Sequence, residues 1–305
     1  MHCGRTETCI RERAHTELWF FLASIVALFW GAAGVFAKIS TPKLGVARVA
    51  FLISLVEGAL YTGAFLIWRQ DVRITFADGV LAASSCIIGI TGYLCFFESI
   101  MKGQVAIAGT ISAAYPVLTV VGAFLVLSET LAPMQAVGVV AIIGGVIALS
   151  YEPNPESKHA LDRRSLLFAF LAFGFWGIWS LTSKMAVDRI TAGNLFAFYI
   201  LSSLTAPLLY GWFRRMRPME LDTRVPARSA WAFGAIALAL NVFGAYAYTY
   251  ALQGGTASLV VPISSAYPIV TVVLAVGLLR EKISRLQALS LGVVVVGLVL
   301  IGLTL

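Results

Sequence analysis

The stretch ISAAYPVLTVVGA at residues 111–123 returns as ISSAYPIVTVVLA at residues 263–275, with nine of thirteen positions identical at an offset of 152. One sequence unit is therefore present twice in the chain. Each copy lies inside a long apolar run and carries a proline, Pro116 or Pro268, which removes the helical hydrogen bond to the carbonyl four residues earlier. The sequence predicts two chemically matched helix breaks.

The composition places the chain in a membrane. Of its 305 residues, 59% are hydrophobic and 12% charged, which is more apolar than one soluble core can hide. The formal net charge of +7 is carried by basic residues in short loops between apolar runs, where such residues orient a membrane protein. We therefore reject nucleic acid as a partner and predict an integral, multi-pass protein of the cell (inner) membrane, with the lipid bilayer around it.

Ten apolar runs of about 20 residues are present, and each is long enough to cross roughly 30 Å of hydrocarbon. They cover residues 18–39, 45–68, 79–100, 104–127, 131–150, 165–187, 192–213, 229–252, 256–279 and 283–304. The polar segment 151–164 divides them into two sets of five and is predicted to be a linker. We expect a polar leader at residues 1–17, a first five-helix repeat at 18–150 and a second at 165–305.

A second set of matches supports the duplication. The first run contains Phe-Trp-Gly ending at Gly31 and then Lys38, and the sixth contains Phe-Trp-Gly ending at Gly177 and then Lys184, at an offset of 146. Because five is odd, two copies in one chain must enter the membrane from opposite sides. The predicted fold is all-α, with ten transmembrane helices arranged as two inverted five-helix repeats.

These motifs resemble the ten-helix EamA-type branch of the drug/metabolite transporter superfamily. The resemblance rests on the Trp-Gly with a downstream lysine, the Tyr-Pro-x-x-Thr of the fourth and ninth runs, and the matched closing positions Glu129/Glu281, Gln135/Gln287 and Gly145/Gly297. It covers nearly the whole chain and implies inverted repeats, export or exchange of small metabolites, and no bound cofactor. Substrates in that family include amino acids, nucleotide sugars, drugs and lipid-linked sugars, so the resemblance does not identify a substrate.

The orientation of the chain stays open. Loops on the side of the N-terminus hold six Lys and Arg residues and those on the other side hold thirteen, which favours termini outside the cell. The first half alone favours an N-terminus inside, and the resemblance implies that both termini are cytoplasmic. The sequence does not decide between these orientations.

The helix breaks are the first candidate site. In a bilayer, a carbonyl without its helical partner is tolerated only where a side chain, water or neighbouring helix meets it. Paired breaks therefore predict a cavity shared by the two halves, lined by Ser112, Pro116, Ser264 and Pro268.

Two tyrosines and two threonines accompany the breaks. Tyr115 and Tyr267 each place a hydroxyl beside a break, where it either binds substrate in a polar cavity or packs in the core. Thr119 and Thr271 follow one turn later, and we expect their hydroxyls to bond back to their own helices.

Matched cations and indoles form a second candidate site. Lys38 and Lys184 lie along strips of small residues near the ends of their runs, where a lysine either snorkels to the headgroups or attracts an anionic or zwitterionic substrate. Trp30 and Trp176 adjoin these strips and either stack on the substrate or pack against lipid and core.

Two further features of the spans are candidates for the transport path. Glu57 lies about halfway along the second run, where an ionised carboxylate is costly unless it is paired, protonated or hydrated. Ser54 and Tyr61 lie three residues before and four residues after Glu57, close enough in a helix to contact it. Glu57 is therefore either a neutral carboxyl group held by hydrogen bonds or a group that couples transport to protons. Tyr246 and Tyr250 share one face of the eighth run and line either a solute path or an interfacial belt.

Other classes of function fit less well. All three histidines lie outside the apolar runs and no HExxH, Ser-His-Asp or clustered carboxylate pattern appears, which disfavours an enzyme and a metal site. No phosphate-binding G-x-x-x-x-G-K-[ST] loop is present, and TVGYG, the filter sequence of potassium channels, is absent.

The sequence therefore predicts a secondary active transporter that exports or exchanges a small metabolite or drug-like solute by alternating access, with proton coupling as a hypothesis. Its substrate would lie at the midplane between runs one, three, four, six, eight and nine. A scaffold or sensor without transport and a lipid-linked sugar flippase are the alternatives. Substrate, direction, coupling ion and oligomeric state are not determined by the sequence.

Overall fold

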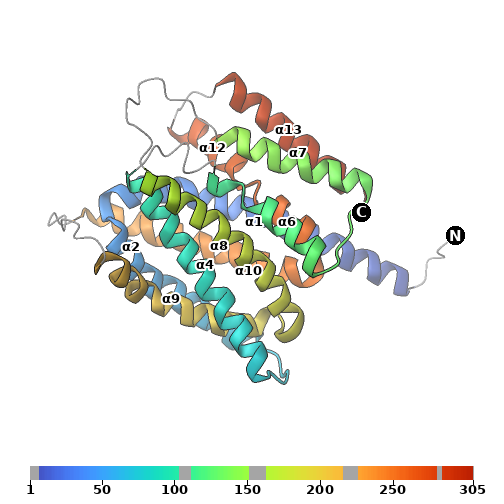
Figure 1. Cartoon of the computed structure of the whole chain (residues 1–305), viewed down its shortest axis with the longest axis horizontal. Coiled ribbons are helices and arrows are strands. Elements are labelled where there is room, and N and C mark those ends of the chain that lie inside the picture. Colours follow the sequence, from blue (N-terminus) through green and yellow to red (C-terminus); the bar gives the residue numbers. More distant parts are fainter. Residues whose placement is uncertain (1–6, 103–110, 151–162, 216–225, 280–283, 305) are drawn as a thin grey trace.

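The chain folds into a bundle of helices (Figure 1). The computed structural model describes residues 7–102, 111–150, 163–215, 226–279 and 284–304, and no strand occurs in these ranges. Among them, nine helices are long and apolar enough to cross a bilayer, and Ile111–Val126 is a shorter apolar helix. The predicted all-α membrane fold is confirmed.

The helices follow the predicted runs closely. The first half contains α1 (Glu7–Leu44), α2 (Val46–Leu52), the π-helix η1 (Ile53–Glu57), α3 (Gly58–Trp68), α4 (Phe76–Lys102), α6 (Tyr115–Val126) and α7 (Pro133–Ser150). The second half contains α8 (Arg163–Ile190), α9 (Ala192–Arg215), α10 (Arg228–Gly254), α11 (Ala257–Ser264), α12 (Tyr267–Leu279) and α13 (Arg285–Gly302). The second run is thus built from α2, η1 and α3, and the ninth from α11 and α12.

Two boundaries differ from the prediction, and a third lies outside the described residues. The first helix begins at Glu7, within the segment expected to be a leader. Residues 151–162 of the predicted linker lie outside the described residues. Its last two residues, Arg163 and Arg164, belong to α8. The start of the fourth run, 104–110, also lies outside the described residues.

Each helix of one half packs mainly on a helix of the other. The main pairs are α1 with α10, α4 with α8, α3 with α9, and α7 with α13. If the two halves exchange places, the pair formed by the first and eighth runs becomes the pair formed by the sixth and third. This is the pattern that an inverted pseudo-twofold axis between the repeats produces. The halves are therefore interleaved rather than placed end to end.

Glycines allow a close contact between α7 and α13, which lie side by side at one edge of the bundle (Figure 1). A Cβ atom added at Gly145 would lie 2.5 Å from Val294 Cγ2 and 3.1 Å from the Ser290 carbonyl oxygen. A Cβ at the neighbouring Gly144 would meet nothing within 4 Å. Small residues at such positions let two helix backbones approach closely in a membrane.

This difference predicts opposite effects for two adjacent substitutions. Gly145→Ala should destabilise the protein by about 1–3 kcal/mol, because the added methyl forces α7 and α13 apart. Gly144→Ala should leave stability unchanged or raise it slightly, since alanine is the better helix former. Melting temperatures of the two variants in the same detergent test this, and equal melting temperatures would show that the contact is not tight.

Candidate functional site

The two proline breaks have the same backbone geometry. In each copy a single short turn joins two helical pieces, and its hydrogen bonds correspond at the 152-residue offset. The first copy has Ala114 N–H to Ile111 O at 3.2 Å and Val117 N–H to Ala114 O at 3.0 Å, and the second has Ala266 N–H to Ile263 O at 3.1 Å and Ile269 N–H to Ala266 O at 3.0 Å. The matched breaks are thus a structural property of both repeats.

The residues around the breaks lie within the protein. Ser112, Tyr115, Pro116 and Ser264 are buried, whereas Tyr267 and Pro268 are half-buried. A broken helix is tolerated at membrane depth when protein or water covers it. Burial of these residues meets that condition.

Each break is docked onto the opposite half by a threonine. Thr119 Oγ1 donates to the Gly177 carbonyl oxygen at 3.2 Å, and Thr271 Oγ1 donates to the Gly31 carbonyl oxygen at 3.0 Å. Both hydroxyls also lie 3.4 and 3.3 Å from the carbonyl four residues back in their own helices. The expected bonds within the helix are therefore present, but the shorter bonds join the repeats, which the sequence did not indicate.

The predicted aromatic residues come together in two matched pairs. The Trp30 and Tyr267 rings meet edge to face with centroids 6.3 Å apart, and those of Trp176 and Tyr115 do so at 5.9 Å. Each indole lies against a glycine of the other half, Gly244 for Trp30 and Gly92 for Trp176. The Trp-Gly motif of one repeat and the Tyr-Pro motif of the other thus form a single unit, and the protein contains two such units.

Glu57 is buried, with 6% of its surface exposed, and it is the last residue of η1. Its Oε1 accepts a hydrogen bond from Asn241 Nδ2 at 3.0 Å, and the Asn241 carbonyl accepts one from Trp30 Nε1 at 3.1 Å. The carboxyl group is therefore connected to an aromatic unit. Ser54, an expected partner of Glu57, instead donates to the Ser203 carbonyl oxygen at 2.7 Å.

Asn241 is the partner that sequence reasoning did not connect with Glu57. It comes from α10, whereas Glu57 lies 184 residues earlier in the chain. An amide within an apolar run was the available signal, because such a group needs a polar partner. Nothing in the linear sequence indicated which group that partner is.

Tyr246 and Tyr250 lie toward the end of α10. The Tyr246 hydroxyl donates to the Leu60 carbonyl oxygen at 2.6 Å. Both rings contact Trp68, the last residue of α3, with centroids 5.3 and 6.1 Å from its indole. These contacts place the two tyrosines in an aromatic cluster at a helix end, away from the two Trp-Tyr units.

The two matched lysines do not meet. Lys38 is exposed, whereas Lys184 donates to Asp188 Oδ1 at 2.7 Å and to the Leu252 carbonyl oxygen at 2.9 Å. They occupy equivalent positions in inverted repeats, so they lie toward opposite ends of the bundle. The two lysines are therefore associated with different sides of the membrane.

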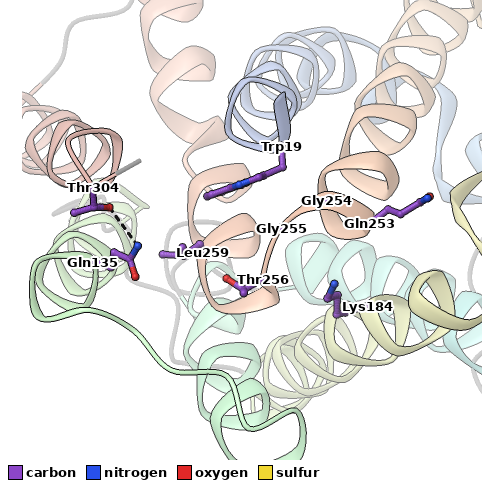
Figure 2. Close-up of a pocket in the computed structure, with 9 residues that line it drawn as sticks. All are labelled: Trp19, Gln135, Lys184, Gln253, Gly254, Gly255, Thr256, Leu259 and Thr304. Carbon is purple, nitrogen blue, oxygen red and sulfur yellow. Dashed lines mark hydrogen bonds between the residues drawn. The ribbon is translucent and has the colours of Figure 1, made fainter. Parts of the chain in front are cut away.

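Lys184 faces a pocket of about 410 Å³ (Figure 2). The pocket lies at the α10–α11 connection and not at the proline breaks. Its lining residues are Trp19, Gln135, Lys184, Gln253, Gly254, Gly255, Thr256, Leu259 and Thr304. Among the sequence-predicted site residues, it brings in Lys184 alone.

A carboxylate from the first half caps α11, the helix whose residue Leu259 lines this pocket. Glu129 Oε1 accepts from Ala257 N–H at 2.9 Å and Glu129 Oε2 accepts from Ser258 N–H at 2.8 Å. These are the first two residues of α11, so the carboxylate caps a helix N-terminus, where negative charge is favoured. The cap joins the two repeats.

Loss of this cap should weaken the protein. Glu129→Ala leaves two backbone N–H groups without their acceptors and should destabilise the protein by about 1–3 kcal/mol. Glu129→Gln keeps one acceptor oxygen and should cost less. Thermal melting of both variants in detergent distinguishes the cap from a surface charge, which would make the two variants equal to the parent protein.

Comparison with known proteins matches this architecture. A model of the EamA-like transporter family matches residues 17–151 and again residues 163–303. The chain belongs to the EamA-like transporter family. It is accordingly a multi-pass integral membrane protein with two repeated halves, as the resemblance of its motifs implied.

Two individual relatives show the repeat and the fold. An uncharacterized protein of Methanocaldococcus jannaschii, MJ1333.1, is 30% identical over 130 residues, which are 42% of this chain and 93% of that protein. That relative is thus about as long as one EamA-matched segment. A chain of known crystal structure superposes with a TM-score of 0.73 at 19% identity, covering 94% of this chain and 99% of the other, and therefore shares the fold.

Proposed function

We propose that this EamA-family protein is a secondary active transporter that exports or exchanges a small metabolite or drug-like solute by alternating access. The observation that carries this proposal is the pair of matched Trp-Gly/Tyr-Pro units, each built from both repeats. We place the substrate between them, bounded by α1, α4, α6, α8, α10 and the α11–α12 break. No enzymatic activity is part of the proposal.

The matched contacts provide two equivalent hinges. The α12 break rests on α1 through Thr271, and the α6 break rests on α8 through Thr119. Because the repeats are inverted, a movement that loosens one unit toward one side of the membrane has a counterpart that loosens the other unit toward the opposite side. We assign residues 18–150 and 165–305 as the two moving repeats, joined by 151–164.

Substrate binding is assigned to the aromatic units. Trp30, Tyr115, Trp176 and Tyr267 present ring faces and hydroxyls at the breaks, and Ser112, Pro116, Ser264 and Pro268 shape the backbone there. Lys38 and Lys184, one toward each end, are proposed to attract an anionic or zwitterionic solute before it reaches the centre. Tyr246 and Tyr250 would border the route rather than the binding position.

Counterflow tests the transport proposal. Purified protein in liposomes preloaded with unlabelled cell extract metabolites should accumulate labelled compounds of the same set, saturably and without ATP. Matched liposomes without the protein provide the control. Failure of every compound to exchange would favour a scaffold, a sensor or a lipid flippase over this function.

Glu57 is proposed as the proton-coupling group. Glu57 is buried at the end of η1 and accepts a hydrogen bond from Asn241. An ionised carboxylate is unfavourable in such a place. A carboxyl group that must be neutral in one state and hydrated in another can carry a proton across with the substrate cycle. The second repeat has Ser203 or Leu204 at the equivalent position, so this role belongs to one half only.

Glu57→Gln should remove coupling while keeping the hydrogen bond to Asn241. We expect flux driven by a pH gradient to fall at least tenfold, whereas exchange without a gradient continues. Ser54→Ala, on the same helical segment, removes a bond to Ser203 and leaves the carboxyl group in place, so its gradient dependence should persist. A Glu57→Gln variant that still responds to the pH gradient would exclude this role.

A further inference from the structure

A group of buried polar atoms in the second repeat has no role in the interactions considered so far. Within the part of the chain that the structure describes, six buried side-chain atoms have no hydrogen-bond partner: Trp179 Nε1, Ser180 Oγ, Thr191 Oγ1, Tyr199 Oη, Tyr248 Oη and Ser264 Oγ. Thr191 joins α8 to α9, and Ser264 is the residue before the α11–α12 break. The other four, Trp179, Ser180, Tyr199 and Tyr248, are referred to as the central donor set.

The central donor set is compact. The rings of Trp179 and Tyr248 are stacked with centroids 5.2 Å apart, and the Tyr248 hydroxyl faces Ser180 without meeting hydrogen-bond geometry. The Tyr199 hydroxyl faces Trp179 and Ser183 in the same way. Three helices, α8, α9 and α10, therefore direct polar atoms into one buried region.

This region adjoins an aromatic unit of the proposed transport site. The Trp30 ring lies 5.2 Å from that of Tyr248 and 6.4 Å from that of Trp179, centroid to centroid. Trp30 also contacts Tyr267 at the α11–α12 break. Trp30 thus connects the central donor set with the α11–α12 break.

The duplicated fold does not require these polar groups. At the offset of 146, Trp179, Ser180 and Tyr199 correspond to Ala33, Gly34 and Ile53, and at the offset of 152, Tyr248 corresponds to Phe96. The first repeat builds the same helices with apolar residues at all four positions. A buried polar atom without a partner destabilises the folded protein, so packing alone would favour the apolar residues here too.

The chemistry of the set indicates what it can bind. An indole N–H only donates, and serine and tyrosine hydroxyls donate readily to a carbonyl or carboxylate oxygen. The surrounding rings offer flat apolar faces. No member of the set carries a positive charge, so the set itself suits neutral acceptor groups rather than a phosphate group, which is bound most strongly by charged donors.

We infer that the central donor set binds the hydrogen-bond acceptor groups of a flat, largely apolar solute without phosphate, and that it determines the substrate class of the proposed transporter. This inference rests on the proposed function. It assigns recognition to the second repeat alone, whereas the matched Trp-Tyr units serve both halves equally.

Two planar probes carry acceptors and no donors: caffeine and the smaller 1,3-dimethyluracil. Binding of the labelled probes to the purified full-length protein in detergent should be saturable for at least one of them. Indole, which is planar but has no strong acceptor, and phenyl phosphate should not compete at equal concentration. Absence of saturable binding for both probes would overturn the inference, as would equal competition by indole or phenyl phosphate.

Removal of single hydroxyls provides the second test. Tyr248→Phe and Tyr199→Phe should each weaken probe binding about tenfold and leave the melting temperature unchanged or higher, because neither deleted hydroxyl makes a hydrogen bond of good geometry to the protein. Thr249→Val is the matched control, since the buried Thr249 hydroxyl donates to the Ala245 carbonyl oxygen at 2.6 Å. It should leave probe binding unchanged.

The outcomes separate this inference from the proposed function. If solutes exchange in liposomes while the two phenylalanine variants bind the probes and transport as the parent does, the inference falls and the transporter proposal stands. If the variants lose binding in detergent while no solute exchanges, the site exists and the transport proposal falls. A lower melting temperature with unchanged binding would show that the hydroxyls only support packing, and would overturn the inference.

Discussion

A helix that breaks inside hydrocarbon must have its exposed backbone covered by other parts of the protein. This requirement acts twice here, at Pro116 and at Pro268, and the same arrangement meets it twice. In each case a threonine one turn beyond the break donates to a glycine carbonyl of the opposite repeat. The halves are therefore held together at the points where each alone would be incomplete.

Close approach of the backbones follows from this docking. A Cβ at Gly31 would lie 2.7 Å from the Tyr267 carbonyl oxygen, and a Cβ at Gly177 would lie 2.7 Å from Leu118 Cδ2. In the Trp-Gly motif, the glycine lets the opposite half approach closely, and the tryptophan packs its large ring against that half. The adjoining indoles, Trp30 and Trp176, then use the room left by glycines on α10 and α4. A short motif, present once in each repeat, thus makes matched contacts with the opposite half.

Symmetry also makes the departures from it informative. Glu57 is matched by Ser203 or Leu204, neither of which is ionisable, and the four residues of the central donor set are matched by apolar residues, although the helices that carry them are duplicated. A scaffold that needed only to fold has no use for unmatched polar groups in its interior, because each one costs free energy there. We therefore propose these asymmetric residues as the ones that give the common fold its particular activity.

The sequence by itself determined the ten apolar helices, their division into two inverted sets and the two matched breaks. Hydropathy, proline and internal identity are local properties of the chain, and an odd number of spans per copy sets the inversion. Only the tertiary structure decided which side chains meet. Thr271 reaches Gly31 across 240 residues, Glu57 reaches Asn241 across 184, and Glu129 caps α11 from 128 residues away. Such contacts depend on how the helices are interleaved and how each is rotated about its axis. A run that is apolar on every side does not indicate which face packs against which neighbour.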